Sequence, residues 1–199
     1  MNNANVEMDK WQYRKDGLQK RRDLDRSINY LFSQTIADSL LEIPVFQKAK
    51  CVFCYASMAD EVQTVDLLNK MLAEVKKVCI PLILKRGHMN AARVPSVDDF
   101  EEGKYGILTV KEDKQIIVDP EEIDCAIIPG TAFGRDGSRV GMGGGFYDRF
   151  LLKAKNATRI GICFEFQISD TVPVEKHDLF MDMIITEKAV YKRMLKGTE

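Results

Sequence analysis

Residues 51–84, CVFCYASMADEVQTVDLLNKMLAEVKKVCIPLIL, decide the fold that we expect. They begin with a short apolar run, CVFCYAS (51–57), and end with another, VCIPLIL (78–84), and such runs are typical of buried strands. Thr64 is expected to cap the helical window between them. The apolar positions of that window form one stripe, made of Val65, Leu68, Met71, Leu72 and Val75. Strand, helix and strand in this order predict an α/β sheet.

The same alternation continues along the chain. We expect strands at IDCAIIP (123–129), TRIGICFEF (158–166) and MIIT (183–186), a helix at FYDRFLLKA (146–154), and a hairpin partner MNAARV (89–94) reached through Arg86-Gly87. Residues 9–41 are expected to be helical, with Ser27 as a candidate cap of a second helix. The predicted fold class is α/β, a single-domain three-layer sandwich with a largely parallel, Rossmann-like open sheet flanked by helices. One domain is expected over residues 1–199, with an α/β core at 50–190.

The composition is that of a soluble globular protein, with 45% hydrophobic and 30% charged residues and a net charge of −1. This charge argues against a dedicated nucleic-acid-binding protein, which usually has a basic excess. Basic residues between positions 10 and 26 are interpreted as a solvated helix face. No apolar run reaches the roughly 18 residues that span a membrane, and the first thirty residues are too polar for a secretory signal. We therefore expect a cytoplasmic protein without a membrane or nucleic-acid partner.

The five cysteines are expected to be reduced, buried thiols. Cys51 and Cys54 form a C-x-x-C pair, but an offset of three residues in a strand places them on opposite faces. The sequence has no second C-x-x-C pair and only two histidines, which disfavours a zinc site. We interpret the thiols as packing residues.

The chemistry is expected in PGTAFGRDGSRVGMGGGFYDRFL (129–151), which holds seven of the 13 glycines. Glycines between the carboxyl end of a strand and a helix let backbone N–H groups approach an anion. Arg135 and Arg139 add partners for phosphate, and Asp148 adds a ligand for Mg²⁺. Two simpler interpretations stay open. The glycines could form a flexible surface loop, and Asp148 could only complement the helix dipole.

Two common phosphate-binding motifs are missing from this segment. A P-loop needs GxxxxGK[ST], and no Gly-Lys in the chain is followed by Ser or Thr. A dinucleotide fingerprint needs GxGxxG, and after Gly141 and Gly143 the third glycine position holds Phe146. Glu165 lies where a ribose-binding acid could follow the next strand, but the glycines begin too far from their own strand. Nicotinamide binding is therefore disfavoured.

The glycine-rich string closely resembles the 5-formyltetrahydrofolate cyclo-ligase family, also called 5,10-methenyltetrahydrofolate synthetases. The matching positions are Gly130, Phe133, Asp136-Gly137, Arg139 and Gly141-x-Gly143-Gly144-Gly145-Phe146-Tyr147-Asp148-Arg149. Three further segments agree in order: Lys15-x-x-Leu18, YASMADEVQT (55–64), and Pro173-Val-Glu-Lys-His177-Asp178 with Asp182 and Thr186-Glu187. The resemblance runs from about residue 15 to 187, and the motif ending in Tyr-Asp-Arg is its specific part.

The resemblance implies an enzyme that uses ATP and Mg²⁺ to cyclise 5-formyltetrahydrofolate to 5,10-methenyltetrahydrofolate, releasing ADP and phosphate. It implies that the formyl oxygen takes the γ-phosphoryl group, that N10 then closes the ring, and that phosphate leaves. Such phosphoryl transfer asks the protein mainly to position reactants and to neutralise charge.

The resemblance also implies roles for individual residues. Asp148 and Asp182 would hold Mg²⁺, and Arg139, Tyr147 and Asp148 would be catalytic. The nucleotide would contact Lys15, Arg139, Val140, Gly141, Met142, Gly143, Gly144, Gly145, Phe146 and Tyr147. The folate would contact Ala56, Met58, Glu61, Met142, Gly143, Gly144, Gly145 and Phe146, with Glu61 bonded to the pterin.

The chain departs from the family pattern at two positions. Gln19 stands where the family commonly has Arg, and Lys20, Arg21 or Arg22 could substitute from an adjacent turn. Phe146 stands where Tyr is common, which keeps the ring and loses a hydroxyl. Two functions therefore remain: a monomeric folate enzyme, or a non-catalytic nucleotide- or folate-binding protein on the same fold. The two acidic metal ligands favour the enzyme, because a folate binder needs no metal.

Overall fold

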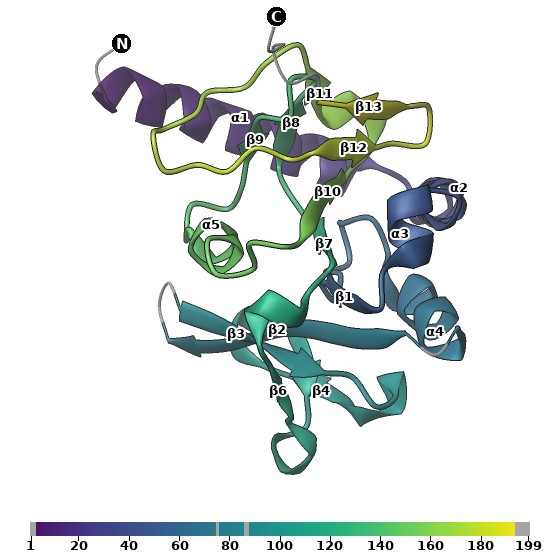
Figure 1. The fold of residues 1–199 in the computed structure, drawn as a ribbon. Coiled ribbons are helices and arrows are strands. Elements are labelled where there is room, and N and C mark those ends of the chain that lie inside the picture. The colour runs from purple at the N-terminus through teal and green to yellow at the C-terminus, as the bar shows by residue number, and fades with distance from the viewer. Residues whose placement is uncertain (1–2, 75, 86–87, 194–199) are drawn as a thin grey trace, which may run out of the picture.

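The computed structural model describes residues 3–74, 76–85 and 88–193 (Figure 1). Its α-helices are α1 (Asn3–Asp23), α2 (Arg26–Leu41), α3 (Pro44–Lys48), α4 (Val65–Ala73) and α5 (Phe146–Leu151). Its strands are β1 (Cys51–Cys54), β2 (Lys77–Lys85), β3 (His88–Arg93), β4 (Phe100–Glu102), β5 (Leu108–Val110), β6 (Ile117–Val118), β7 (Cys125–Ile128), β8 (Ala132–Gly134), β9 (Arg139–Val140), β10 (Thr158–Ile162), β11 (Ile168–Ser169), β12 (Met183–Ile185) and β13 (Val190–Lys192). The 3₁₀ helices are η1 (Val97–Asp99), η2 (Lys104–Gly106), η3 (Glu112–Lys114), η4 (Pro120–Glu122) and η5 (Glu165–Gln167). The turn predicted at residues 86 and 87 lies outside the described residues.

Eight strands of the described chain form the main sheet, in the order β13-β12-β10-β7-β1-β2-β3-β6. The five central strands, from β12 to β2, are parallel, and β13, β3 and β6 are added antiparallel at the edges. Helices lie on both faces of this sheet, so the predicted α/β fold with a largely parallel open sheet is confirmed (Figure 1). The chain leaves β1 towards β2 on one side and later adds β7 on the other. The direction of winding therefore reverses between β1 and β7.

The residues of β1 alternate between two hydrophobic clusters, one on each face of the sheet. Val52 and Cys54 belong to the cluster that includes α2, α3 and α4, whereas Cys51 and Phe53 belong to the cluster that includes α5. The prediction that Cys51 and Cys54 point to opposite faces is thus confirmed. All five cysteines are free and buried, as expected of packing residues.

The N-terminal helical stretch is divided into α1 and α2 at Leu24 and Asp25. Asp25 caps α2, because its carboxylate accepts the backbone N–H groups of Ser27 and Ile28 at 2.8 and 3.4 Å. The prediction that Ser27 is the cap is therefore wrong. Ser27 already lies inside the first turn, and the aspartate two residues earlier supplies the oxygen that the exposed N–H groups need.

Several predicted strands are shorter than expected. The first ends at Cys54, and the residues after it turn into a loop that Thr64 closes. The Thr64 hydroxyl donates to the Tyr55 carbonyl at 2.8 Å and accepts the Ser57 N–H at 3.0 Å. Thr64 does stand at the N-cap of α4, but its side chain makes no capping hydrogen bond. The loop, and not the helix, therefore determines the position of this side chain.

The glycine-rich segment is only partly a loop. Its first half forms β8 and β9, which pair antiparallel and join β11 in a small second sheet. Helix α1 lies against this sheet. Gly17 permits the close approach, because a Cβ at this position would lie 2.1 Å from the Thr131 carbonyl oxygen. The backbone of α1 thus comes into direct contact with the segment that leads to the glycine loop.

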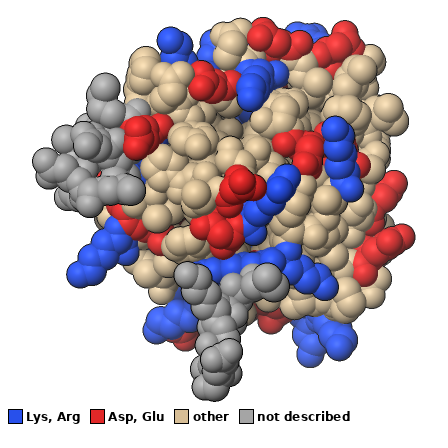
Figure 2. Space-filling model, turned by 90° about the horizontal axis from the view of Figure 1, so that it is seen from above, with Lys and Arg blue, Asp and Glu red and all other residues tan. Residues whose placement is uncertain are grey.

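The surface seen from above carries acidic and basic side chains interspersed among uncharged ones (Figure 2). This distribution agrees with the nearly balanced 29 basic and 30 acidic residues. Within the described ranges, no helix has the length and apolar character needed to cross a membrane.

Candidate active site

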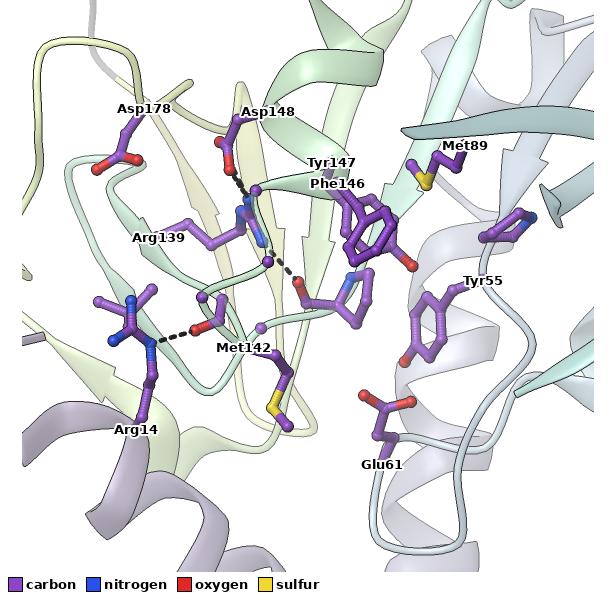
Figure 3. Close-up of a pocket in the computed structure, with 18 of the residues that line it drawn as sticks. Arg14, Tyr55, Glu61, Met89, Arg139, Met142, Phe146, Tyr147, Asp148 and Asp178 are labelled. Atoms are coloured by element: carbon purple, nitrogen blue, oxygen red, sulfur yellow. Dashed lines mark hydrogen bonds and ion pairs between the residues drawn. The ribbon is translucent and has the colours of Figure 1, made fainter. Parts of the chain in front are cut away.

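A large pocket lies at the carboxyl ends of β1 and β7, where the direction of winding reverses. Open α/β sheets commonly bind ligands at such a point. The pocket has a volume of about 510 Å³, which is in the range of small-molecule and cofactor sites. Arg14 of α1, the glycine loop and Asp178 lie on one side, and Tyr55, Glu61 and Met89 lie on the other (Figure 3). The pocket therefore has a charged side and a mostly apolar side.

The glycine loop at 141–145 forms a wall of nearly bare backbone on the charged side. Gly143 and Gly145 have φ angles of +90° and +61°, which residues with a Cβ rarely adopt. Arg14 of α1 donates from Nε to the Gly141 carbonyl at 2.9 Å and so ties the loop to the helix (Figure 3). A wall without bulky side chains lets a ligand approach the backbone closely, as phosphate groups require.

Arg139 and Asp148 form an ion pair beside this wall. Arg139 Nη2 lies 3.1 and 3.0 Å from the two carboxylate oxygens, and the Leu179 N–H donates to Oδ1 of Asp148 at 3.3 Å. Nη1 donates to the Pro129 carbonyl at 3.2 Å, whereas the buried Nε has no hydrogen-bond partner among the described residues. A buried donor without a partner costs about 1–3 kcal/mol. This guanidinium is therefore suited to a further acceptor, such as a phosphate oxygen.

Lys10 of α1 is buried between two carboxylates of the same side. Its Nζ lies 2.6 Å from Glu175 Oε2 and 2.5 Å from Asp178 Oδ2. The hydrogen bond from this ammonium group lowers the pKa of Glu175 below its ordinary value. Glu175, His177 and Asp178 could also hold a metal ion, since their ligand atoms lie within 4.8 Å of one another. Lys10 already supplies a positive charge at that position.

The apolar side contains one buried carboxylate, that of Glu61, whose side chain is 11% exposed. The Met58 N–H donates to Glu61 Oε2 at 3.0 Å. Burial raises the pKa of Glu61, and the nearby Arg21 guanidinium opposes this shift. Burial also raises the pKa of the Tyr55 and Tyr147 phenols, so both stay neutral at physiological pH. An apolar slot with a carboxylate suits a flat heterocycle that carries N–H groups.

Most of the residues predicted for the site line this one pocket. They are Ala56, Met58, Glu61, Arg139, Val140, Gly141, Met142, Gly143, Gly144, Gly145, Phe146, Tyr147 and Asp148. Lys15 does not line it, because it lies on the exposed side of α1 with Nζ 5.3 Å from the Trp11 ring centroid. Asp182 also lies outside it, and Arg159 donates to its two carboxylate oxygens at 2.9 and 3.1 Å. In this structure Asp148 and Asp182 therefore do not share the pocket.

Three cations of α1 line the pocket: Lys10, Arg14 and Arg21. Lys10 and Arg14 were expected only on a solvated face, and Arg21 was one of three possible substitutes for the missing arginine. Steps of four and seven residues put them on one side of a helix, near Gly17. Apolar residues in α1 show no helical periodicity, so the hydrophobic pattern could not orient this helix. The spacing of the basic residues around Gly17 is the signal that could have found them.

The charged side of the pocket fits a polyphosphate and, in part, Mg²⁺. The bare glycine wall, the unpartnered Nε of Arg139 and the nearby Arg14 suit phosphate oxygens. Mg²⁺ is commonly held by one or two carboxylates together with substrate phosphates. Asp148 provides one such carboxylate, and Asp178 lies in the same wall.

The model of the 5-formyltetrahydrofolate cyclo-ligase family matches residues 6–187 of this chain. A probable 5-formyltetrahydrofolate cyclo-ligase of Caenorhabditis elegans is 28% identical over 167 residues, which cover 78% of this chain and 81% of the relative. A probable 5-formyltetrahydrofolate cyclo-ligase of Schizosaccharomyces pombe is 29% identical over 178 residues, which cover 81% and 87%.

Two solved structures have the same fold. The NMR structure of Aquifex aeolicus 5,10-methenyltetrahydrofolate synthetase has a TM-score of 0.84 at 29% identity, and the match covers 96% of this chain and 95% of that one. The 5,10-methenyltetrahydrofolate synthetase of Mycoplasma pneumoniae has a TM-score of 0.74 at 25% identity, with coverage of 90% and 99%. Both similarities extend over nearly the whole chain.

Proposed function

This chain belongs to the 5-formyltetrahydrofolate cyclo-ligase family, and from that premise we propose that it closes 5-formyltetrahydrofolate to 5,10-methenyltetrahydrofolate with ATP and Mg²⁺. It is a ligase of folate metabolism, as its named relatives are. One observation supports ATP dependence most strongly. A single pocket combines a bare glycine wall and buried cations on one side with an apolar slot and a carboxylate on the other.

The triphosphate of ATP is proposed to lie along the glycine loop at 141–145. Arg139 can donate to it through the Nε that has no partner among the described residues. Arg14 already holds the loop through Gly141, and its guanidinium faces the same wall. Lys10 adds a third cation, so Lys10 and Arg14 take the place first expected for Lys15.

The folate is proposed to occupy the apolar side. Its pterin would donate N–H groups to the Glu61 carboxylate, which the Met58 N–H holds from behind. Ala56, Met58 and Phe146 would flank the ring, and Tyr147 would border both ligands. In this proposed arrangement the formyl group would lie near the junction of the two sides, where the glycine loop meets α5.

Mg²⁺, when bound, would neutralise phosphate charge during transfer. Asp148 is the carboxylate proposed to hold it, because it lies in the pocket beside Arg139. The resemblance makes Asp182 a second ligand. That role requires Asp182 to leave its ion pair with Arg159, so the proposal for Asp182 rests on the resemblance alone.

The proposed reaction is a phosphoryl transfer followed by ring closure. The formyl oxygen of 5-formyltetrahydrofolate attacks the γ-phosphorus of ATP, and the bond to ADP breaks. N10 then attacks the activated formyl carbon and releases its proton to water, and phosphate leaves with the formyl oxygen. The protein's own contribution is to hold the two substrates together and to stabilise negative charge, which Arg139 and Lys10 can do from the pocket wall.

The alternative of a non-catalytic binding protein rested on Gln19. In the structure Gln19 Nε2 donates to Asp23 Oδ1 at 2.8 Å on the exposed side of α1, away from the pocket. Arg22 is likewise exposed and donates to the Leu18 carbonyl of its own helix. The missing arginine therefore removes no cation from the pocket, and we propose the enzyme, as a cytoplasmic monomer.

The test is to mix the purified protein with 5-formyltetrahydrofolate, ATP and Mg²⁺ and to follow the near-ultraviolet absorbance of the product. We expect a rise that requires both ATP and Mg²⁺. Asp148→Asn should reduce turnover at least about 100-fold, because it removes the carboxylate proposed to hold Mg²⁺, and Mg²⁺ would neutralise the phosphate charge during transfer. The matched control is Asp170→Asn, at a side chain that is 92% exposed, and it should have wild-type activity. No rise with the wild-type protein would overturn the proposal.

A further inference from the structure

Arg21 is a buried guanidinium that connects α1 to both sides of the pocket. Its side chain is 3% exposed. It forms a bidentate, fork-like pair with Asp60, in which Nε donates to Oδ2 at 3.2 Å and Nη2 donates to Oδ1 at 2.8 Å. Its Nη1 donates to the Gly130 carbonyl at 3.4 Å, and its Nη2 lies 3.6 Å from Glu61 Oε1. The fork with Asp60 leaves the guanidinium little freedom, and Glu61 is its second anionic neighbour.

Glu61 is held in place by its own loop and by Asn29 of α2. Its backbone carbonyl accepts from Asn29 Nδ2 at 3.1 Å and from Gln63 Nε2 at 2.8 Å, and its carboxylate accepts the Met58 N–H. Loop contacts therefore determine where this carboxylate lies. They supply only one hydrogen bond to the carboxylate itself, and a buried carboxylate needs more than this to stay charged.

We propose that Arg21 is a positioning residue of the folate side, which keeps the Glu61 carboxylate charged and directed at the N–H groups of the bound ring. The inference rests on the proposed function, since it takes the ring of 5-formyltetrahydrofolate as the donor. Asp60 is the partner that fixes the guanidinium in place. Arg21 itself does not touch the substrate and acts through Glu61.

The charged and titratable groups around Glu61 determine in which direction its pKa changes when Arg21 is removed. Arg21 faces it from α1, Asp60 from its own loop, Tyr55 from the end of β1 and Tyr147 from α5. Burial raises the pKa of Glu61, and Arg21 is the positive group that opposes this. Removal of Arg21 should therefore raise the pKa further, so that Glu61 becomes protonated nearer to neutral pH. A protonated carboxyl loses an acceptor for the ring.

The test is a calorimetric titration of 5-formyltetrahydrofolate into the full-length protein, without ATP, between pH 6 and 9. For wild type we expect the Kd to change less than about threefold over this range. For Arg21→Met we expect binding at pH 6 to be about tenfold weaker than at pH 9, because the Glu61 carboxyl is then mostly protonated at the lower pH and charged at the higher one. Arg21→Lys keeps the charge and should restore most of the wild-type pH profile.

Four further variants separate this role from a general effect of charge or folding. Arg22→Met makes the same change one residue along, at an exposed position, and should leave the profile unchanged. Arg21→Met with Asp60→Asn removes both members of the fork and avoids an unpaired buried carboxylate, so it serves if the single variant does not fold. Glu61→Gln should bind weakly at every pH, and adding Arg21→Met to it should change the Kd by less than about twofold.

The outcomes distinguish this inference from the proposed function. Wild-type protein that does not bind 5-formyltetrahydrofolate overturns both. Wild-type binding, together with an Arg21→Met profile parallel to that of wild type, overturns only the role of Arg21. An equal shift in Arg22→Met would mean that net charge alone is responsible, and would overturn it as well.

Discussion

Helices α1 and α2 follow one another in the chain and are held to the molecule in different ways. Helix α2 buries Ile36, Ala37 and Leu40 against the sheet, as an amphipathic helix does. Helix α1 has no apolar stripe and is attached through Lys10, Arg14 and other cations to the walls of the pocket. The difference shows that a helix without an apolar stripe can be oriented by the polar contacts that it makes with the walls of a pocket.

The largest effect is expected from the apolar helix. Leu40 is fully buried, so Leu40→Ala should lower the free energy of unfolding by about 3 kcal/mol through the cavity it leaves. Urea unfolding measures this, and activity per folded molecule should not change. Leu31 of the same helix is 61% exposed, and Leu31→Ala should cost less than about 0.5 kcal/mol. Equal losses for the two variants would contradict the packing described for α2.

The second prediction concerns α1, and here the expected effect is on ligand binding. Lys10→Met removes a buried cation from the charged side of the pocket and should weaken ATP binding about 10- to 100-fold, as expected for a charged hydrogen bond. The matched variant Lys15→Met, on the exposed side of α1, should bind ATP as wild type does. Calorimetric titration of ATP with Mg²⁺ checks both. A loss in Lys15→Met alone would restore the role first expected for Lys15.

The third prediction tests the junction between the two helices. Asp25→Ala removes the cap of α2 and should lower the free energy of unfolding by about 1 kcal/mol. Ser27→Ala leaves the Asp25 carboxylate and its bonds to backbone N–H groups in place. It should therefore lower the free energy of unfolding by only about 0.3 kcal/mol. Thermal unfolding of the two variants measures the difference. The reverse order would make Ser27 the cap after all.

The smallest effect is expected from pH. The pKa of Glu175 lies below its ordinary value of 4.5 because Lys10 bonds to it. Its contribution to stability is therefore complete above about pH 4.5 and is lost as the pH falls through the lower pKa of the folded state. Glu175→Gln should flatten the fall in stability below pH 4.5, measured by urea unfolding. Glu101→Gln, at an exposed position, serves as the control and should keep the wild-type slope.

The fold could be predicted because most of its elements carry a hydrophobic pattern. The strands at 51–54 and 125–128 are fully buried, and α4 has a clear apolar stripe. The ends of these elements could not be predicted, since tertiary contacts such as the Thr64 hydroxyl bonds decide where a strand gives way to a loop. The strands β8 and β9 of the glycine-rich segment could not be predicted, because they are too short to show a hydrophobic pattern.

The site could be predicted where its residues lie in a short, specific motif. The segment from Arg139 to Asp148 lines the pocket as expected. The residues on α1 could not be placed, because a basic stretch without apolar periodicity does not reveal which of Lys10 and Lys15 faces inward. Asp182 was expected from the resemblance alone, and only the three-dimensional structure reveals its pairing with Arg159.

The attachment of α1 also has a consequence for synthesis on the ribosome. Lys10 bonds to Glu175 and Asp178, which lie 165 and 168 residues later in the chain. At about 5–20 residues per second, α1 leaves the ribosome roughly ten seconds or more before these partners exist. A helix with a long apolar stripe would expose an aggregation-prone apolar surface during this interval, whereas α1 exposes charged side chains that water solvates well. A helix made early in synthesis is thus less prone to aggregate while it waits, and the pocket is completed only when Glu175 and Asp178 have been made.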